Sequence, residues 1–344
     1  MNSLWMSLSR KALFSLEPED AHAFTLATLN TLYATGASRL LFPTPVVPPT
    51  QVMGLSFPNR IGLAAGVDKN GECINGFGAL GFGFLELGGV TPRAQPGNEK
   101  PRVFRLPQVN GLINRLGFNN HGVQALVNNL ARFRARGRYQ GVIGVNLGKN
   151  KDTPNENALE DYRSCYEQLY SLTDFATINV SSPNTQGLRA LQETDELRTI
   201  LAGMKAAQAR LADKHGKYVP LSVKIAPDLT QEQLQAIATL AISEKIDAIT
   251  ATNTTLARET VADLPYGQEA GGLSGAPLFA RSNEVIRTLA KLLDGALPII
   301  GVGGVMSGAD AKLKLDCGAS LVQFYTGLIY RGPQLVAESI KSCQ

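Results

Sequence analysis

The chain has 344 residues, of which 44% are apolar and 18% charged, and its formal net charge is +4. A chain of this length and composition buries a large core, and so weak and dispersed a positive charge argues against a nucleic-acid-binding protein. The cysteines (Cys73, Cys165, Cys317 and Cys343) lie far apart without a C-x-x-C pair, so we expect no metal site, no disulfide framework and a reducing, cytosol-facing environment.

Residues 1–42 predict a small helical extension. Pro18, Glu19 and Asp20 resemble the start of a helix that runs to about Gly36. Residues 43–50, within "FPTPVVPPT", form a proline-rich linker to a main domain at 51–344. The extension either packs on that domain as a pair of helices or lies in a membrane surface as a monotopic anchor. No apolar run reaches the roughly 18 residues of a spanning helix, and we find no signal-peptide cleavage pattern.

After the linker, short apolar runs alternate with helical patterns. Such runs predict a parallel sheet buried on both faces, and this many predict a closed (β/α)8 TIM barrel, with a doubly wound open sheet as the competitor. The segment 91–140 is too long for a simple loop and predicts an insertion over the barrel mouth. Strands are expected at 61–66, 84–90, 141–148, 175–182, 219–226, 248–255, 298–305 and 320–327, and helices at 190–213, 230–245 and 281–293.

Polar residues cluster where most of these strands end. In a parallel barrel the carboxyl ends of all strands converge on one face, where active sites are built. The sequence therefore predicts an enzyme with its site at this face. The residues concerned are Lys69, Asn146, Asn179, Ser182, Lys224, Thr252, Asn253, Thr254, Tyr325 and Thr326.

Glycines at the seventh strand predict a phosphate site. "GVGG" at 301–304 precedes a helix that begins near Ser307, and bare backbone N–H groups beside a helix start bind phosphate. "GGLSG" at 271–275 is a second glycine cluster. The G-x-G-x-x-G match at 76–81 precedes a strand instead of following one, so it does not indicate a dinucleotide site. A cofactor with one phosphate is expected, either FMN or pyridoxal phosphate.

Asparagines indicate the substrate. An amide offers both a donor and an acceptor, so several amides match a ring with alternating N–H and C=O groups, as in a pyrimidine. Ser182 has no histidine near it in the sequence and no G-x-S-x-G elbow, so it is not the nucleophile of a hydrolase triad. The asparagines are Asn114, Asn119, Asn120, Asn179, Asn184 and Asn253.

From about residue 10 to its end, the chain resembles the class 2 dihydroorotate dehydrogenases, which are FMN-dependent and reduce quinone. Ser182 stands where the class with a cysteine base carries cysteine, and that class usually lacks the extension. Both features favour class 2. The motifs that carry the resemblance are "LAAGVDKNGE" (63–72), "TPRAQPGNEKPR" (91–102), "GLINRLGFNNHG" (111–122), "NVSSPNTQGLR" (179–189), "VKIAPDL" (223–229), "ATNTT" (251–255), "GGLSG" and "IIGVGG".

The resemblance implies a role for each site residue. Ser182 is implied as the base that takes the C5 proton of dihydroorotate while hydride leaves C6 for the flavin, with Thr185 and water as a proton relay and Phe118 closing the pocket. Lys224 lies at the flavin pyrimidine edge, and Lys69 reaches both the flavin and the orotate carboxylate. The implied FMN contacts are Ala65, Gly66, Val67, Asp68, Lys69, Gly89, Asn146, Asn179, Lys224, Thr252, Gly275, Gly304, Tyr325 and Thr326. The implied substrate contacts are Lys69, Asn114, Arg115, Leu116, Gly117, Phe118, Asn179, Asn184, Asn253 and Thr254.

Further expectations concern the extension and the competing functions. At Gly89 relatives commonly carry a hydroxyl residue. His22 and Arg105 match the polar pair at the inner end of a quinone tunnel. The resemblance also implies a monomer attached peripherally to the cytoplasmic face of the cell membrane, acting in de novo pyrimidine biosynthesis. The alternatives are a Schiff-base enzyme using Lys224 or Lys69 and a non-catalytic protein that binds a phosphate ligand or a lipid surface.

Overall fold

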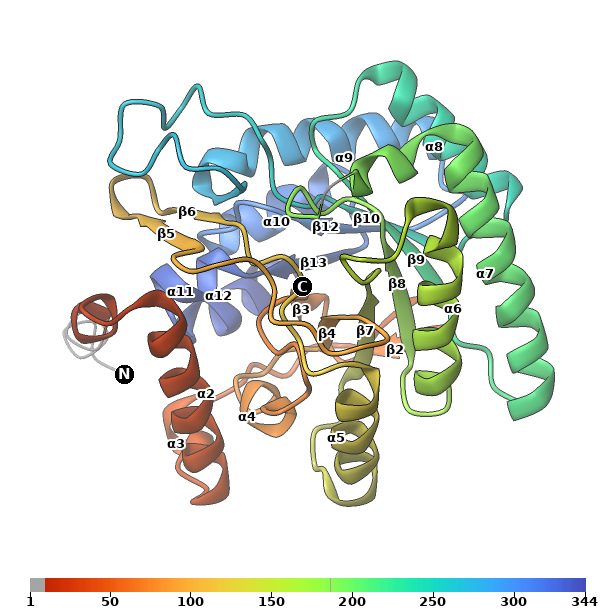
Figure 1. Ribbon diagram of the computed structural model, residues 1–344. Coiled ribbons are helices and arrows are strands. Elements are labelled where there is room, and N and C mark those ends of the chain that lie inside the picture. Colours follow the sequence, from red (N-terminus) through yellow and green to blue (C-terminus); the bar gives the residue numbers. More distant parts are fainter. Residues whose placement is uncertain (1–9, 186) are drawn as a thin grey trace.

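Residues 10–185 and 187–344, which this computed structural model describes, form a closed barrel surrounded by helices (Figure 1). Parallel strands close it in the order β10-β12-β13-β3-β4-β7-β8-β9. The predicted (β/α)8 barrel is confirmed, and the open sheet is wrong because the first barrel strand pairs with the last. The barrel strands are β3 (Ile61–Leu63), β4 (Phe84–Val90), β7 (Val142–Leu147), β8 (Phe175–Asn179), β9 (Leu221–Ile225), β10 (Ala248–Ala251), β12 (Ile299–Val302) and β13 (Leu321–Phe324).

The predicted helices lie on the outside of the barrel. The segments 190–213, 230–245 and 281–293 correspond to α7, α8 and α9 within a few residues. At the start of α8, the Thr230 hydroxyl and the Gln233 side chain each accept the other's backbone N–H, which is a capping box. The helices around the barrel are α4 (Ile74–Gly78), α5 (Val123–Arg136), α6 (Ala158–Leu169), α7 (Thr194–His215), α8 (Gln231–Ser243), α9 (Phe279–Leu293), α10 (Gly308–Asp316), α11 (Thr326–Arg331) and α12 (Gln334–Ser342).

Aromatic rings fill the amino end of the barrel. Phe84 and Phe175 begin β4 and β8, and their ring centroids lie 6.3 Å apart. The hairpin β1 (Thr50–Val52) and β2 (Leu55–Phe57) adds Phe57, which contacts the Phe84 ring edge-on at 5.3 Å. All three are fully buried. This end is therefore closed, and the barrel opens only toward the carboxyl ends of its strands among the described residues.

An antiparallel sheet lies beside the barrel mouth. It contains β5 (Val103–Leu106), β6 (Gly111–Asn114) and β11 (Gly272–Gly275), in the order β11-β6-β5. The predicted insertion at 91–140 supplies β5 and β6, but its last part is the barrel helix α5. The "GGLSG" cluster is β11, in which Leu273 pairs with Ile113. Segments about 160 residues apart in sequence therefore form one wall of the mouth.

The extension packs against α4 and the mouth insertion. Helix α2 (Pro18–Ala34) begins where expected, and the Glu17 carboxylate accepts the backbone N–H groups of Glu19 and Asp20 at 2.8 and 3.1 Å. It is followed by α3 (Ser38–Leu41). Residues 1–9 of the predicted extension lie outside the described residues. None of the described helices is both long enough and apolar enough to cross a membrane.

Candidate active site

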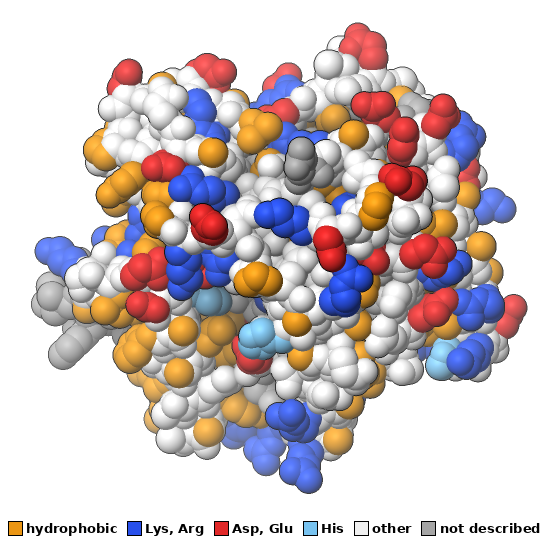
Figure 2. Space-filling model, in the orientation of Figure 1, with side chains coloured by type: hydrophobic (Ala, Val, Ile, Leu, Met, Phe, Trp, Pro, Cys, Tyr) orange, Lys and Arg blue, Asp and Glu red, His pale blue; other side chains and the backbone are white. Residues whose placement is uncertain are grey.

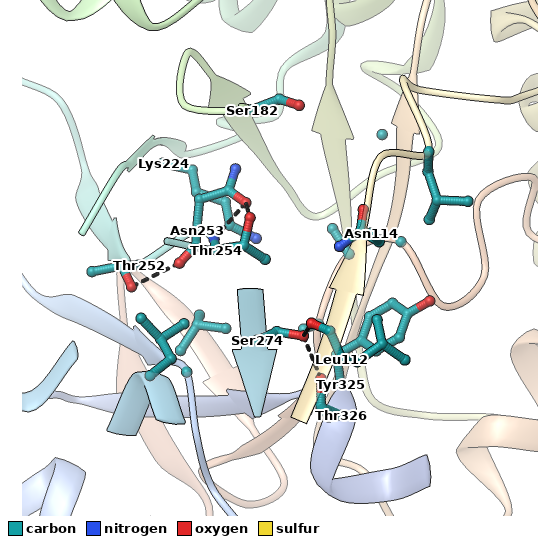
Figure 3. Close-up of a pocket in the computed structure, with 18 of the residues that line it drawn as sticks. Leu112, Asn114, Ser182, Lys224, Thr252, Asn253, Thr254, Ser274, Tyr325 and Thr326 are labelled. Atoms are coloured by element: carbon teal, nitrogen blue, oxygen red, sulfur yellow. Dashed lines mark hydrogen bonds between the residues drawn. The ribbon is translucent and has the colours of Figure 1, made fainter. Parts of the chain in front are cut away.

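A cavity opens at the carboxyl ends of the barrel strands, where the sequence placed the site. Its empty space is about 1010 Å³, counting the part open to solvent. Figure 3 shows Ser182 near one end and Thr326 near the other, with Lys224 and Asn253 on one side and Asn114 opposite. Most predicted residues line it: Ala65, Gly66, Lys69, Gly89, Asn114, Leu116, Gly117, Phe118, Asn146, Asn179, Ser182, Asn184, Lys224, Thr252, Asn253, Thr254, Gly275, Gly304, Tyr325 and Thr326.

Three of the contacts implied by the resemblance do not line this cavity, and neither do Asn119 and Asn120 of the predicted asparagines. Val67 is buried in the core. Asp68 accepts the backbone N–H groups of Glu72 and Cys73, both at 2.8 Å, and burial raises its pKa to about 6. Its carboxylate therefore orders the loop after β3. Arg115 forms an ion pair with Glu269 at 2.6 Å and stacks over the Phe104 ring, so its side chain is engaged outside the cavity.

A buried carboxylate, Glu86 in β4, sets the orientation of the amides beside it. Glu86 accepts hydrogen bonds from Asn146 Nδ2 at 2.7 Å and Gln323 Nε2 at 2.6 Å. Because a carboxylate only accepts, Asn146 must turn its Oδ1 toward the next strand. There it accepts from Asn179 Nδ2 at 2.9 Å, and Asn179 Oδ1 in turn accepts from Asn253 Nδ2 at 3.3 Å. A one-way ladder of amides thus crosses β4, β7, β8 and the end of β10.

Ser182 lies on the loop after β8. Its Oγ accepts the backbone N–H of Asn184 at 3.3 Å, and no described side chain lies within hydrogen-bond distance of it as a base. Asn184 Nδ2 donates to Asn114 Oδ1 at 3.1 Å, while Asn184 Oδ1 is buried without a partner. An unsatisfied buried acceptor beside a pair of amides and a hydroxyl is an arrangement that a polar ring can complete.

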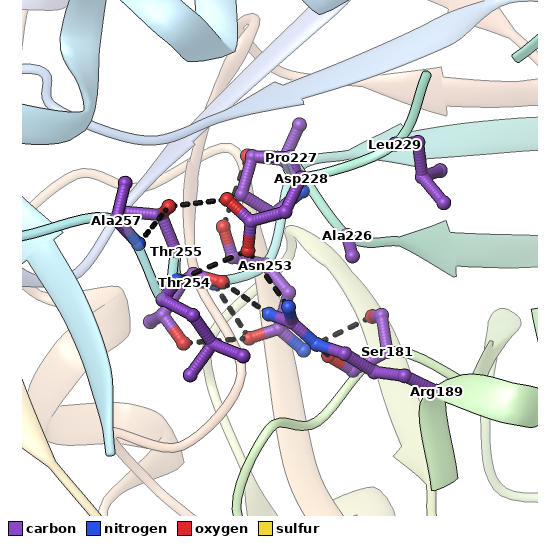
Figure 4. A network of polar contacts seen from close by, with 12 residues as sticks. Ser181, Arg189, Ala226, Pro227, Asp228, Leu229, Asn253, Thr254, Thr255 and Ala257 are labelled. Carbon is purple, nitrogen blue, oxygen red and sulfur yellow. Dashed lines mark hydrogen bonds and ion pairs between the residues drawn. The ribbon is translucent and has the colours of Figure 1, made fainter. Parts of the chain in front are cut away.

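Arg189 ties the Ser182 loop to two neighbouring loops (Figure 4). Its Nε donates to the Ser181 carbonyl at 3.2 Å and its Nη2 to the Thr254 carbonyl at 2.7 Å. Its Nη1 pairs with Asp228 at 2.7 Å, and Asp228 also accepts from the Thr255 hydroxyl. One guanidinium thus fixes the loops after β8, β9 and β10 relative to one another.

Two lysines, Lys69 and Lys224, line the cavity. Lys224 in β9 is buried, which lowers its pKa, although the nearby Glu86 opposes the change. Burial lowers the pKa of Lys69 to about 8; Glu19 raises it and Arg102 lowers it further. At this value Lys69 is mostly protonated at neutral pH. Lys69 therefore supplies a cation that suits an anionic ligand.

Glycines and hydroxyls form the far end of the cavity. Gly303 and Gly304 follow β12 with φ angles of +121° and +79°, and a Cβ on Gly304 would lie 2.5 Å from the Phe279 Cα. The Thr326 and Ser274 hydroxyls are 2.8 Å apart. This end offers backbone N–H groups and hydroxyls without side-chain bulk, as a phosphate site requires.

The ring of Phe118 accounts for glycine at position 89. A Cβ on Gly89 would lie 2.5 Å from the Phe118 ring, which also lines the cavity. A hydroxyl side chain at position 89 would displace this ring. Glycine at position 89 therefore leaves room for the Phe118 ring in this chain.

His22 and Arg105 lie outside this cavity. Burial and the neighbouring Lys69 lower the pKa of His22 to about 4, although Glu19 opposes the shift, so the imidazole is neutral at neutral pH. Arg105 donates to the carbonyls of Leu16 at 2.9 Å and Phe14 at 3.2 Å, and its guanidinium stacks over the Phe14 ring. Its donors therefore hold the segment before α2 against the mouth insertion.

Several lining residues were not among the predicted contacts. Ser274 and Gly303 stand inside the glycine motifs at 271–275 and 301–304, so these motifs are a usable signal. Leu112 and Leu278 carried no such signal, because an apolar residue looks alike in a core and in a cavity wall. Glu86 was also missed, although a lone acid within an apolar strand marks a buried polar network. The further lining residues are Ala64, Leu112, Ser274, Leu278, Val302, Gly303, Val305, Phe324 and Gly327.

Comparisons with known proteins agree on one family. The family described as Dihydroorotate dehydrogenase matches residues 49–343. The chain is 56% identical to "Dihydroorotate dehydrogenase (quinone)" of Thiobacillus denitrificans over 97% of this chain and 98% of that protein. The protein of the same name from Burkholderia multivorans is also 56% identical, over 97% and 96%. A crystal structure of DHODH in complex with ferulenol from Eimeria tenella superposes with a TM-score of 0.85 at 37% identity, covering 95% of this chain and 90% of that one.

Proposed function

The chain belongs to the dihydroorotate dehydrogenase family, and we propose that the cavity at the mouth of its barrel is the site of the reaction. The enzyme is a flavin-dependent oxidoreductase that oxidises dihydroorotate to orotate and passes the electrons to quinone, in pyrimidine biosynthesis. This replaces the Schiff-base and non-catalytic alternatives. The main support for this site is that Ser182, the hydrogen-bonded amides of Asn114 and Asn184, and Lys224 all line one cavity, which also has a glycine-lined end.

The residues present fit FMN as the flavin. The glycine end at Gly303 and Gly304 suits its single phosphate, with the Thr326 hydroxyl beside it. The amides of Asn146 and Asn179 and the ammonium of Lys224 suit the polar edge of an isoalloxazine ring. When bound, the flavin supplies a hydride acceptor. Ala65, Gly66, Lys69, Gly89, Thr252, Gly275 and Tyr325 complete the proposed lining.

Ser182 acts as the base in this proposal. Its Oγ takes the proton from C5 of dihydroorotate, which the adjacent carbonyl acidifies, as hydride leaves C6. Since Oγ already accepts a hydrogen bond from the Asn184 N–H, negative charge that develops on it is partly stabilised. The hydroxyl must lose its own proton as it gains one, so Thr185, which is buried on the same loop, or a water must carry a proton onward.

Amides and cations orient the substrate. Asn114, Asn184, Asn253 and Thr254 present donors and acceptors to the pyrimidine edge, and Leu116, Gly117 and Phe118 exclude water from it. Lys69 pairs with the substrate carboxylate, because it lines the same cavity as the amides and is mostly protonated at neutral pH. Lys224 supplies a fixed positive charge against the negative charge that accumulates on reduction.

The extension is proposed to deliver quinone. Residues 1–42 would form a hood joined by the linker 43–50 to the catalytic domain 51–344, with His22 and Arg105 at its inner end. What supports this is the position of the extension, because α2 packs against α4 and β5 beside the cavity and Arg105 of β5 binds the carbonyls of the segment before α2. The same proposal places a monomer at the cytoplasmic face of the cell membrane, attached peripherally. A truncation that begins near residue 48 should keep reduction of the flavin by dihydroorotate and lose turnover with a long-chain quinone.

An anaerobic half-reaction tests the proposed site. The purified yellow protein is mixed with dihydroorotate without quinone, and loss of the flavin absorbance is followed. We expect bleaching in the wild type and slow bleaching in Ser182→Ala with the flavin retained. A Ser182→Ala variant that bleaches at the wild-type rate would remove Ser182 from this role.

A further inference from the structure

The described part of the extension exposes apolar side chains. Val46 is 98% exposed, Leu40 88% and Phe24 60%, and these belong to the linker, α3 and α2. Figure 2 shows apolar side chains gathered on the lower left of the molecule, where Figure 1 places α2, α3 and α4. We call Phe24, Leu40, Leu41 and Val46 the apolar patch. A patch of a few such side chains gives only weak, reversible attachment to a lipid surface without a second attractive contribution.

A group of arginines stands at the carboxyl end of α5. Arg132, Arg136 and Arg138 are exposed, and among the described residues none of them forms an ion pair or donates a side-chain hydrogen bond. We call these three the arginine cluster. Arg134, between them in sequence, is different: it pairs with Asp174 at 2.8 Å and donates to the Leu172 carbonyl. Arg134, which packs against the barrel, thus has partners for its charge and its N–H groups, whereas the other three guanidinium groups lie in solvent.

The arginine cluster and the apolar patch flank the same short segment. Asn75 of α4 accepts the backbone N–H groups of Arg138 at 3.0 Å and Tyr139 at 3.3 Å. On the other flank Asn30 of α2 donates to the Glu72 carbonyl at 2.9 Å. The glycines of this segment show the same arrangement. A Cβ on Gly78 would lie 2.5 Å from Tyr139, on the side of the arginine cluster, and a Cβ on Gly81 would lie 2.6 Å from Thr44 of the linker, on the side of the apolar patch.

The figures agree with these contacts. In Figure 1, α2, α3 and α5 all extend to the lower edge of the molecule, with α4 between them. In Figure 2, Lys and Arg side chains gather at that lower edge, next to the apolar side chains on its left. A flat surface that touches the apolar patch therefore also comes close to the arginine cluster.

We propose that the arginine cluster binds the headgroups of anionic phospholipids while the apolar patch inserts beside it. This rests on the proposed use of a membrane quinone. Unpaired guanidinium groups match lipid phosphates in charge and geometry, and basic residues near an anionic leaflet are a principal source of attraction for peripheral proteins. The cluster supplies the second contribution that the small apolar patch needs. The enzyme is thereby directed to anionic membranes, and its attachment weakens as salt rises.

Vesicle sedimentation tests this assignment. The full-length holoenzyme is mixed with vesicles of phosphatidylcholine alone or of phosphatidylcholine with one quarter phosphatidylglycerol. We expect the wild type to bind the anionic vesicles far more strongly, and the triple variant Arg132→Gln/Arg136→Gln/Arg138→Gln to lose about 10²-fold of that binding. Binding to the neutral vesicles should not change. High salt should bring the wild type to the level of the variant.

A charge-matched control separates this site from net charge. Arg198→Gln/Arg287→Gln/Lys291→Gln removes three exposed cations from α7 and α9, away from the lower edge in Figure 1, and both triple variants lower the formal net charge from +4 to +1. The control should bind anionic vesicles like the wild type. Equal loss in both variants, or no loss in the α5 variant, would overturn the proposal.

The outcome is independent of the proposed catalytic site. Both triple variants should bleach with dihydroorotate at the wild-type rate in the absence of vesicles, because the arginine cluster does not line the cavity. A wild type that fails to bleach would refute the proposed active site and leave the vesicle result to stand by itself. A second variant, Leu40→Gln/Val46→Gln, should weaken binding to neutral and anionic vesicles alike, since it changes only the apolar patch.

Discussion

Replacement of Gly304 by alanine should weaken flavin binding without unfolding the enzyme. Gly304 has φ +79°, a region that costs an L-residue about 1–2 kcal/mol. The added Cβ would also lie 2.5 Å from the Phe279 Cα and 2.7 Å from its N, where ordinary contact begins at 3.4 Å. These are backbone atoms at the start of α9, so Gly304 itself must move by most of an ångström. A shift of that size breaks a hydrogen bond to a phosphate oxygen, which is worth about 1.5–3 kcal/mol, so we expect flavin to bind about 10- to 100-fold more weakly.

Gly295 provides a matched control for this substitution. It has the same φ of +79°, and a Cβ built on it meets nothing within 4 Å. Gly295→Ala therefore measures the conformational cost alone. The assay is the dissociation constant of FMN by fluorescence titration of the apoenzyme, with thermal unfolding of both variants. If Gly304→Ala binds FMN as tightly as Gly295→Ala does, the glycine end does not hold the phosphate.

Three further predictions concern the base, its loop and a buried lysine. Ser182→Ala should slow flavin reduction by dihydroorotate by about 10²–10⁴-fold in stopped-flow experiments, because general-base catalysis is lost. Arg189→Met should slow the same step and weaken orotate binding, since the Ser182 loop loses its contacts with two neighbouring loops. Arg189→Lys should restore little activity, because lysine cannot form all three contacts at once. Unchanged kinetics in Arg189→Met would contradict this role. Burial lowers the pKa of Lys314 from 10.5 to about 7. Between these two pH values the lysine is protonated in the unfolded chain and mostly neutral in the folded one. The free energy of unfolding should therefore increase as pH rises through this range. Lys314→Met should lose this dependence in urea unfolding at pH 7 and 9; an equal slope in both proteins would contradict it.

Barrel and site were accessible to sequence reasoning for one physical reason. Parallel strands that are buried on both faces appear as continuous apolar runs, so each polar residue at the end of a run stands out. Asn146, Asn179 and Lys224 were found in this way, and all three line the cavity. The glycine end was found because "GVGG" breaks an apolar run in the same manner.

What the sequence did not reveal depends on contacts between distant segments. The pairing of β11 with β6 joins residues 272–275 to 111–114, and no local pattern announces it. Asp68 and Arg115 were placed among the ligand contacts through their motifs, but their partners in space, the loop N–H groups and Glu269, direct them elsewhere. A motif identifies the neighbourhood of a site, whereas the direction of a side chain depends on which partner lies nearest.

Glu86 illustrates how one such contact governs the chemistry of the site. Asparagine can present either end of its amide, so the site amides alone do not define which groups face a ligand. The carboxylate of Glu86 can only accept, and it occupies the Nδ2 of Asn146; the Oδ1 of Asn146 then occupies the Nδ2 of Asn179. The hydrogen bond from each amide to the previous one therefore sets its orientation. Replacing Glu86 by glutamine would leave the shape of the cavity intact but would remove the group that fixes this order, so the amides could turn and offer the wrong atoms to the ring.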